Sequence, residues 1–409
     1  MKTYPEIDVE KDCLKDSQRP SPWDGVVRQV YKVPLRLLHY NVDNGRIATF
    51  VSGYRSDTSL TPLEELPLDR FNDVIGAFVK QSSSTDIYNH TYRDIAKKGQ
   101  LQVGAILADG TVVAGNRRFT VLRQLIAEGQ DREKFGYFLC NIYPMPKNEE
   151  ELKQIKRLET LTQFNEDSPV PYGPIDKLVD IYHNVNECSS TGQYSALEYA
   201  KFLNMKPGMM RDFISRAQIL VDYLNYIGKP GNFDIARKDA LDGPISELAG
   251  VRKKAGSTTW SEIKGTFYHR LWSLENQGGD RTRLIRKFIR SYESDPIGFR
   301  AIQAQNDEEE LSNDAKKLNL GGQTEPAPAV SPESDSSFNV MVETYQARSA
   351  NASAKREPIG HLNDAYNALN NVYEESYELM APADKEQFKK LLDEIEIRLA
   401  TIKKAIANK

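Results

Sequence analysis

The chain of 409 residues contains little cysteine and little histidine. Its three cysteines, Cys13, Cys140 and Cys188, are odd in number and widely separated, and its five histidines show no ligand-type spacing. Disulfide frameworks and zinc sites are typically marked by even numbers of cysteines or by closely spaced Cys and His pairs. The sequence therefore predicts neither a disulfide framework nor a metal site.

Long apolar segments are also missing. The first twenty residues, MKTYPEIDVEKDCLKDSQRP, are charged and contain no apolar run of the kind found in a signal peptide. No window approaches the roughly 20 apolar residues that span a bilayer. We therefore expect a soluble, cytoplasmic protein with no membrane partner.

The chain has no overall positive charge, since its formal net charge is −4 at pH 7. This excludes a uniformly basic nucleic-acid-binding protein, so any DNA contact must be local. One local candidate is Arg252–Arg290, in which basic residues far outnumber acidic ones and surround Trp260, Phe267, Tyr268 and Trp272. This composition suits a DNA-backbone surface. Alternatively, the helical spacing of the apolar residues indicates a core helix pair with charged outer faces.

The most informative segment is Leu101–Leu125, LQVGAILADGTVVAGNRRFTVLRQL. It predicts a strand, an Asp109-Gly110 turn, a second strand and then an amphipathic helix that begins at Gly115–Arg118. Free backbone N–H groups and the positive end of the helix dipole attract anions at such a helix start. Two arginines add forked donors that suit phosphate oxygens. The segment favours a phosphate site, although many such corners are only solvated helix starts.

Three short boxes of this chain follow one another as in a known superfamily. Gly115-Asn116-Arg117-Arg118, followed by Val121-Leu122, resembles the G-x-R-R box of the ParB/sulfiredoxin-like superfamily. Upstream, Gly99–Val103 is similar to the G-x-x-Q-P box, with Val103 in place of proline. Asn41–Arg46 resembles the N-x-x-N-x-R segment that follows the first strand, Val33–Tyr40. The three boxes occur in the family's order over about a hundred residues, which is more specific than any single box.

The resemblance implies a nucleoside-triphosphate site, with CTP and Mg²⁺ as the expected ligands, because the G-x-R-R box of ParB proteins contacts the triphosphate of CTP. Arg117 and Arg118 would hold phosphates, Gln102 would line the pocket, and Gly115 would let the backbone approach closely. The site residues implied in this way are Gly99, Gln102, Gly115, Asn116, Arg117 and Arg118.

Two departures from the family pattern limit what the resemblance implies. Sulfiredoxin carries a reactive cysteine in the turn, whereas this chain has Gly-Asn-Arg-Arg, so reduction of sulfinic acids is not expected. The third nucleotide box, E-N-x-x-R, should fall near Gln163–Pro174, where the chain has QFNEDSPVPYGP and no arginine. The following Pro174–Lys177 still resembles the family's P-I-E-x. Nucleotide hydrolysis is therefore left open, as is compensation by Arg157 or Lys177.

A helix-turn-helix is predicted at Ser195–Arg216, SALEYAKFLNMKPGMMRDFISR. Such a unit needs a small residue at the helix crossing, a turn residue and two later apolar positions, which Ala200, Asn204, Met210 and Phe213 supply. Its second helix would present DNA-contacting residues outward, namely Lys206, Arg211, Ser215 and Arg216. The alternative is an ordinary helical hairpin.

The expected fold class is α+β. A small mixed-sheet ParB/sulfiredoxin-like domain would be followed by an all-α helix-turn-helix domain and a C-terminal helical hairpin. The expected boundaries are a polar tail at 1–26, the mixed-sheet domain at 27–146, the helical domain at 147–300, a disordered linker at 301–340 and a helical hairpin or coiled coil at 360–409. The last segment would either form a homodimer or pack on the body.

These features favour a ParB-like protein that binds double-stranded DNA and a nucleoside triphosphate and acts in DNA partition or regulation. Two alternatives stay open. A ParB-like nuclease or phosphotransferase would need carboxylates near the arginine corner, and the local candidates are Asp109, Glu159 and Glu166. A non-catalytic adaptor of a mobile element or defence system would pair the arginines with acidic side chains instead. Whether the protein is an enzyme, for example a weak CTPase, is not decided by the sequence.

Overall fold

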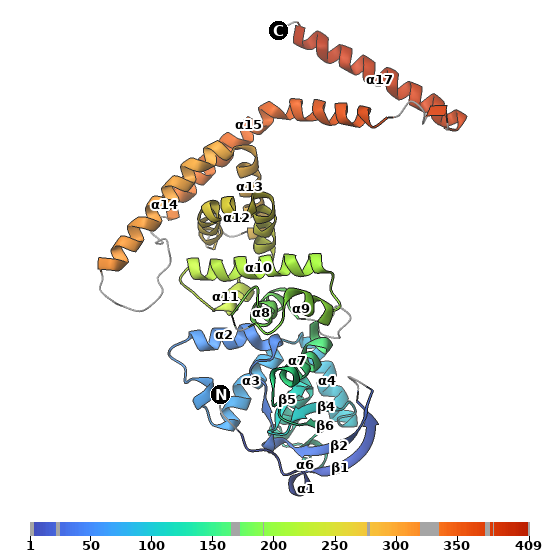
Figure 1. Cartoon of the computed structure of the whole chain (residues 1–409), viewed down its shortest axis with the longest axis vertical. Coiled ribbons are helices and arrows are strands. Elements are labelled where there is room, and N and C mark those ends of the chain that lie inside the picture. Colours follow the sequence, from blue (N-terminus) through green and yellow to red (C-terminus); the bar gives the residue numbers. More distant parts are fainter. Residues whose placement is uncertain are drawn as a thin grey trace.

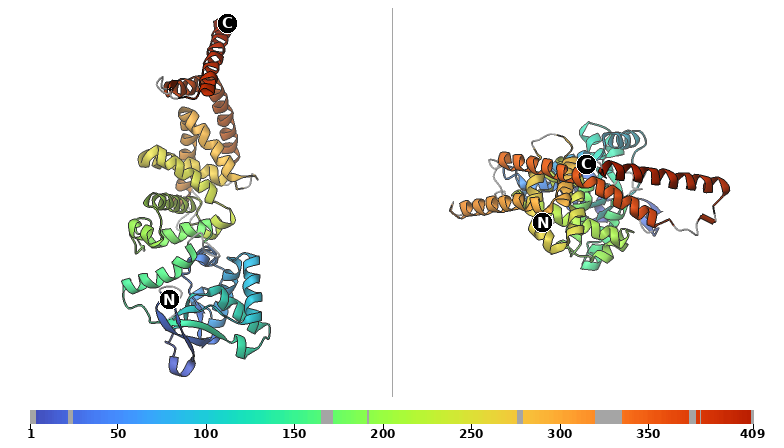
Figure 2. Two further views of the ribbon diagram at one scale, coloured as in Figure 1. Left: turned by 90° about the vertical axis from the view of Figure 1, so that its right-hand side faces the viewer. Right: turned by 90° about the horizontal axis from the view of Figure 1, so that it is seen from above.

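The computed structural model describes residues 4–21, 25–164, 172–190, 192–275, 279–319, 335–372, 377–378 and 380–407. The molecule is elongated, with a sheet-containing part at one end and helices stacked toward the other (Figures 1 and 2). The predicted α+β class is confirmed, since strands are confined to the N-terminal part and helices make up most of the rest of the described chain.

The N-terminal part is built on one six-stranded mixed sheet in the order β1-β2-β6-β4-β5-β3. Antiparallel pairs are β1·β2, β2·β6 and β4·β5, whereas β4·β6 and β3·β5 are parallel. The strands are β1 (Leu14–Pro20), β2 (Val27–Pro34), β3 (His39–Tyr40), β4 (Gly104–Leu107), β5 (Thr111–Ala114) and β6 (Tyr137–Tyr143). The strand expected at Val33–Tyr40 is thus divided into the end of β2, a 3-10 turn, η1 (Leu35–Leu37), and the two-residue strand β3.

Helices pack on this sheet and carry most of its apolar cover. They are α2 (Ala48–Ser56), α3 (Leu68–Gln81), α4 (Thr85–Lys98), α5 (Asn116–Ala127) and α6 (Arg132–Phe135), with the short 3-10 turns η2 (Gly45–Ile47) and η3 (Leu63–Glu65). The periodic apolar residues of Leu68–Gln81 predict α3 at its observed bounds. The core is closed by fully buried residues from both layers, such as Ile75, Ile106, Phe119 and Phe138.

The expectation of a polar tail at 1–26 is wrong for the described residues. The segment forms a short helix, α1 (Val9–Asp12), and the edge strand β1, which pairs with β2 from Leu14 to Pro20. Almost every side chain of β1 is exposed, so its sequence lacks the apolar alternation that marks a half-buried strand. Backbone pairing with β2 therefore provides its structure.

The second part of the chain is helical. Its elements are α7 (Glu149–Phe164), α8 (Pro174–Asn184), α9 (Ala196–Phe202), α10 (Pro207–Tyr226), α11 (Phe233–Lys238), α12 (Asp242–Ser273) and α13 (Arg281–Ser294). Trp260, Phe267 and Tyr268 of α12 are buried against α10 and α13, as the core-helix interpretation of Arg252–Arg290 predicts. These aromatic rings therefore stabilise the helical core.

The linker expected at 301–340 is wrong at both of its ends. Helix α14 (Pro296–Asn319) continues through the first part, and α15 (Asp335–Asn370) begins within the last part. Phe338 and Val342 of α15 are fully buried in the helical core, and Tyr345 is buried beside them. The remaining residues of the expected linker, 320–334, lie outside the described part of the chain.

The C-terminal segment leaves the body. The helical hairpin or coiled coil expected at 360–409 corresponds to the end of α15, which stops at Asn370, and to α17 (Pro382–Ala407). Both lie beyond the packed helices at the far end of the molecule (Figures 1 and 2). Apolar side chains of α17 are exposed, for example Leu391, Ile397 and Ile406, and no described residue of α17 is buried. The alternative in which this segment packs on the body is therefore wrong for α17.

Candidate anion-binding site

The corner between β5 and α5 depends on Gly115. Its φ of 100° lies in the left-handed region, and a Cβ atom there would stand 2.8 Å from Cζ of Phe138 and 3.0 Å from Nη2 of Arg118. Only glycine fits this backbone conformation and this close approach without strain. The chain can therefore turn directly from the buried strand into α5 and place Asn116, Arg117 and Arg118 in the first turn of that helix.

Two of the three sequence boxes meet at this corner. Nη1 of Arg118 donates a hydrogen bond to Oε1 of Gln102 at 2.7 Å, and Nε of Arg117 donates to Oγ of Ser83 at 3.2 Å. Among the described residues, neither guanidinium has a carboxylate within ion-pair distance. The other N–H donors of both groups also lack a protein acceptor there, so they are available to an external anion.

The third box adds a third guanidinium, that of Arg46. Asn44 accepts a hydrogen bond from the Arg46 backbone N–H at 3.0 Å and so shapes the turn η2 that carries it. Burial, together with the nearby charges of Arg46 and Arg118, lowers the pKa of Arg117 to about 10. Burial likewise lowers the pKa of Arg118 to about 10. We call Arg46, Arg117 and Arg118 the arginine cluster; their mutual repulsion would be relieved by a bound anion.

Asn116 supplies an independent sign of an absent partner. It is 8% exposed, yet neither its Nδ2 nor its Oδ1 atom has a hydrogen-bond partner among the described residues. A buried polar group without a partner costs about 1–3 kcal/mol of folding free energy. Because Asn116 is the first residue of α5, its amide lies beside the free backbone N–H groups of the helix start. The corner thus combines uncompensated charge with unsatisfied polar atoms.

Gly99, one of the site residues that the resemblance implies, lies at the end of α4. It ends α4 with a φ of 74° and donates its N–H to the Ile95 carbonyl at 2.8 Å. Gln100 then anchors the following loop, because its side chain bonds both the N–H and the carbonyl of Leu139, at 2.9 and 2.7 Å. This loop carries Gln102 to Arg118, so Gly99 positions the site from a distance.

A buried charged network lies on the helical side of Arg46. Nζ of Lys156 stands 3.6 Å from Glu159 and 3.5 Å from Asp180, and Asn41 donates to Glu159 at 3.3 Å. Tyr199 donates to the other oxygen of Asp180 at 2.5 Å. The network therefore links the mixed-sheet part, through Asn41, to α7, α8 and α9.

Burial sets the protonation of these carboxyl groups. Burial, opposed by Lys156, raises the pKa of Glu159 to about 7, and burial raises the pKa of Asp176 to about 6 despite its bond from Thr49 at 2.9 Å. Burial lowers the pKa of Lys156, but Glu159 and Asp180 raise it more, so the ammonium group stays charged. Sequence analysis missed Lys156 and Asp180. The sequence pattern that could have predicted this network is the pair Asp176 and Asp180, which stand four residues apart on the apolar face of α8.

Of the three carboxylates named for a nuclease, the two that the structure describes, Asp109 and Glu159, have different partners. Glu159 lies in the buried network, whereas Asp109 stands 3.9 Å from Nε2 of His39 beside β3. Glu166 and most of the expected third nucleotide box lie outside the described residues. Within the described part of the chain, no group of three or more His, Cys, Asp or Glu residues is arranged to hold a metal ion.

The two helices predicted at Ser195–Arg216 are present as α9 and α10. Ser195 and Glu198 form a capping box at the start of α9, and Asn204 takes a φ of 52° in the turn. Ala200 and Met210 are buried where the helices meet, as the spacing predicts. Lys206 and Arg211 are exposed, and Ser215 is half-buried.

Arg216 departs from the prediction that it faces outward. Its side chain is only 14% exposed, and its guanidinium pairs with Asp242 at the start of α12 and, at 3.8 Å, with Asp212. The contact with Asp242 could not be foreseen because the two residues are distant in sequence. Arg216 therefore joins α10 to α12 instead of offering a free charge.

Arg157 and Lys153 of α7 lie against the same two-helix unit. The Arg157 guanidinium is 5.8 Å from the centre of the Phe202 ring, and the Lys153 ammonium is 5.3 Å from that of Tyr194. Arg157 is thus directed toward α9, and no described contact joins it to the arginine cluster.

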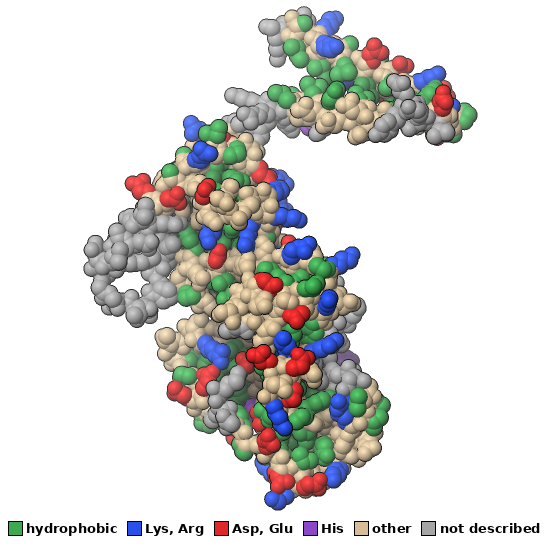
Figure 3. Space-filling model, viewed as in Figure 1, with side chains coloured by type: hydrophobic (Ala, Val, Ile, Leu, Met, Phe, Trp, Pro, Cys, Tyr) green, Lys and Arg blue, Asp and Glu red, His purple; other side chains and the backbone are tan. Residues whose placement is uncertain are grey.

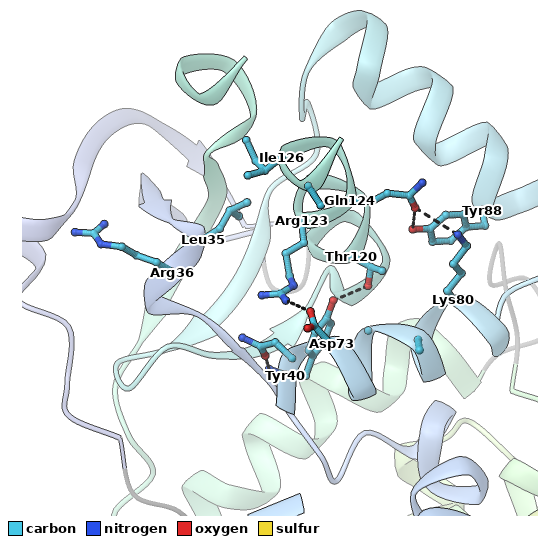
Figure 4. Close-up of a pocket in the computed structure, with 14 residues that line it drawn as sticks. Leu35, Arg36, Tyr40, Asp73, Lys80, Tyr88, Thr120, Arg123, Gln124 and Ile126 are labelled. Atoms are coloured by element: carbon cyan, nitrogen blue, oxygen red, sulfur yellow. Dashed lines mark hydrogen bonds and ion pairs between the residues drawn. The ribbon is translucent and has the colours of Figure 1, made fainter. Parts of the chain in front are cut away.

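A cavity of about 380 Å³ lies between α3 and α5, but it is separate from the arginine cluster (Figure 4). Its polar groups bond to one another: Tyr40 with Thr120 at 2.8 Å, Arg123 with Asp73 at 2.8 Å and Tyr88 with Gln124 at 2.8 Å. Since no residue of the arginine cluster lines it, this cavity does not define the site.

No family model, no curated protein and no solved structure matches this chain. In the part of the chain that the structure describes, no helix is both long and apolar enough to cross a membrane. The functional assignment therefore rests on the chemistry of the residues themselves.

Proposed function

We propose that the protein binds a nucleoside triphosphate at the arginine cluster and acts as a ParB-like, nucleotide-dependent DNA-binding protein. The observation that carries this proposal is the grouping of Arg46, Arg117 and Arg118 around the start of α5, without a carboxylate partner for Arg117 or Arg118 among the described residues. A polyphosphate supplies the negative charge that Arg117 and Arg118 lack, whereas Arg46 already lies near Asp176.

The donors fit a phosphate chain. Arg117 and Arg118 offer charge-assisted N–H groups, and the first-turn amides of α5 add the positive end of the helix dipole. Gly115 brings backbone close to the ligand, and Gln102 holds the Arg118 guanidinium in place. The unsatisfied amide of Asn116 can accept and donate one further bond each. Mg²⁺, if bound with the nucleotide, would be held chiefly by phosphate oxygens and water, as is usual for this ion.

The DNA-binding half of the proposal is supported by the helix-turn-helix spacing of α9 and α10. Lys206 and Arg211 are exposed cations of its turn and second helix, and Ser215 lies further along that helix. Charged contacts to DNA phosphates supply most of the affinity of such units, so these two residues are the expected anchors. The expected roles are DNA partition or regulation in the cytoplasm.

The adaptor alternative requires the arginines to pair with acidic side chains of a partner protein. It predicts no nucleotide affinity, whereas the triphosphate proposal predicts affinity that depends on Arg118. The two are separated by calorimetric titration of CTP, ATP and GTP with Mg²⁺, with and without duplex DNA.

The matched pair of variants is Arg118→Ala and Arg123→Ala, because both arginines lie on α5 but Arg123 pairs with Asp73 outside the site. We expect Arg118→Ala to lower triphosphate affinity by at least about a hundredfold, the lower limit for losing two charge-assisted bonds, and Arg123→Ala to leave it unchanged. Equal affinities for the wild type and Arg118→Ala, or no binding of any triphosphate by the folded wild type, would refute the nucleotide site.

A further inference from the structure

Most cations of the basic stretch Arg252–Arg290 are occupied within the protein. Four form ion pairs: Lys254 with Glu293, Lys264 with Asp222, Arg281 with Asp239 and Arg286 with Glu247. Two donate hydrogen bonds to neutral acceptors: Arg252 to the Ser215 carbonyl and Arg270 to the Asn339 side chain. These six residues join α12 and α13 to each other and to α10, α15 and Asp239. The positive excess read from the sequence therefore overstates the charge that is free to meet a partner.

Three cations of α13 are different. Arg283, Lys287 and Arg290 are exposed and have no carboxylate within ion-pair distance among the described residues. They stand at positions i, i+4 and i+7, which places them on one face of the helix over about 10 Å of its length. We call these three residues the α13 stripe. The opposite face of α13 is buried through Ile285, Phe288 and Ile289, so the stripe is held on a rigid support.

The acidic residues next to the stripe do not neutralise it. Asp280 caps the helix, accepting hydrogen bonds from the N–H groups of Thr282 at 2.9 Å and Arg283 at 3.2 Å. The Glu293 carboxylate forms an ion pair with the Lys254 ammonium group at 2.6 Å. The stripe is thus a row of regularly spaced positive charges. In Figure 3, Lys and Arg side chains are frequent along the right-hand edge of the molecule, from the level of α13 toward that of α9.

We infer that the α13 stripe contacts the phosphate backbone of duplex DNA, as a second contact besides α9 and α10. This inference rests on the proposed DNA-binding function and adds to it a sequence-independent contact surface. Regularly spaced phosphates match regularly spaced cations on a rigid helix. A membrane surface fits less well, because interfacial helices insert an apolar face and the apolar face of α13 is already buried in the core.

The test compares two triple variants of the full chain that lose the same charge. One removes the stripe, Arg283→Gln, Lys287→Gln and Arg290→Gln. The control removes three paired cations of the same region, Lys254→Gln, Arg281→Gln and Arg286→Gln. Binding to a fluorescent duplex of arbitrary sequence is measured from about 50 to about 200 mM salt, the range over which phosphate contacts change affinity strongly. Circular dichroism melting checks that both variants fold.

We expect removal of the stripe to make the slope of log affinity against log salt less steep by about 2.7, or 0.9 for each lost phosphate contact, while the control changes it far less. Equal slopes for the two triple variants, or a stripe variant that binds like the wild type, would overturn the inference alone. A wild type without salt-dependent duplex binding would overturn both the inference and the DNA half of the proposed function. Binding of the wild type to phosphatidylserine vesicles but not to the duplex would also overturn the inference.

Discussion

The arginine cluster and the basic helices α10–α13 use the same residue types in opposite ways. Arg216 and Arg286 each reach a carboxylate on α12, and Arg281 reaches Asp239, just after α11. Arg117 and Arg118 instead donate to neutral oxygens, those of Ser83 and Gln102. The comparison teaches that a carboxylate partner neutralises an arginine within the fold, whereas Arg117 and Arg118, each with one neutral partner, keep charge and N–H donors for a ligand.

The two regions should also differ in their effect on stability. A paired, half-buried arginine contributes to folding, and its removal leaves a carboxylate without its partner. In the arginine cluster the like charges repel one another, so the fold bears a cost that a ligand would relieve.

The largest expected effect on stability comes from replacing Gly115, at the corner between β5 and α5. Gly115→Ala should lower the free energy of unfolding by about 2–4 kcal/mol, since alanine is strained at a positive φ and its Cβ would meet Phe138. Urea unfolding measures the change. Gly250→Ala in α12 is the matched control, because a Cβ atom there has no neighbour within 4 Å; it should be neutral or slightly stabilising. Equal effects of the two variants would mean that Gly115 is not required.

The next prediction compares the loss of Arg216 with the loss of Arg211, which lies on the same helix. Arg216→Ala should lower the free energy of unfolding by about 1–2 kcal/mol, because Asp242 loses its partner, whereas Arg211→Ala should change it by less than about 0.5 kcal/mol. Duplex binding should respond in the opposite order, with Arg211→Ala the weaker binder. An Arg216→Ala variant with wild-type stability and impaired DNA binding would contradict the distinction.

A third prediction concerns pH and Glu159. Because burial raises the pKa of Glu159 from 4.5 to about 7, the folded state holds its proton more tightly than the unfolded chain does. Its stabilising contribution is complete below the unfolded value and is lost as the pH rises through the folded value. The free energy of unfolding contributed by this group should therefore fall between about pH 4.5 and about pH 7.

Glu159→Gln removes this titration, so the variant does not lose this contribution as the pH rises. Between about pH 4.5 and about pH 7, the unfolding free energy of the variant should therefore increase relative to that of the wild type by about 1–3 kcal/mol. Denaturant unfolding at several pH values measures it. Burial lowers the pKa of His269 to about 4, which makes stability rise with pH over part of the same range, but this contribution is common to both proteins and cancels. The exposed Glu65→Gln serves as a control and should keep the wild-type profile; a constant difference for Glu159→Gln would contradict the prediction.

The smallest expected effect on stability is that of Asn116→Ala. Since the Asn116 amide has no partner, its removal should leave the free energy of unfolding unchanged or raise it by about 1 kcal/mol, while triphosphate affinity falls about tenfold. Asn72→Ala is the matched control. Asn72 is also buried, but it accepts from the Tyr40 N–H at 3.3 Å and donates to the Leu38 carbonyl at 2.9 Å, so its loss should destabilise the fold without affecting the ligand. A destabilised Asn116→Ala with normal affinity would show that Asn116 only supports the fold.

Sequence patterns were reliable wherever one face of an element is apolar. The periodic residues of Leu68–Gln81 predicted α3 at its observed bounds, and the Asp109-Gly110 pair predicted the turn between β4 and β5. The same method failed for β1, whose side chains are exposed on both faces, and for the start of α15 at 335–340, where polar residues precede the buried Phe338. Local composition does not register an edge strand or a helix held by a few distant contacts.

The sequence by itself determined the turn at Gly115, the helix that follows it and the presence of two arginines in the first turn of that helix, because these depend on backbone preferences over a few residues. Only the tertiary structure decided that Gln102 and Arg46 lie beside those arginines. It also decided that Arg216 forms an ion pair with Asp242, and that Glu159 and Asp180 both pair with Lys156 in a buried network. The physical reason is that the charge state and availability of a side chain depend on burial and on partners brought from distant parts of the chain.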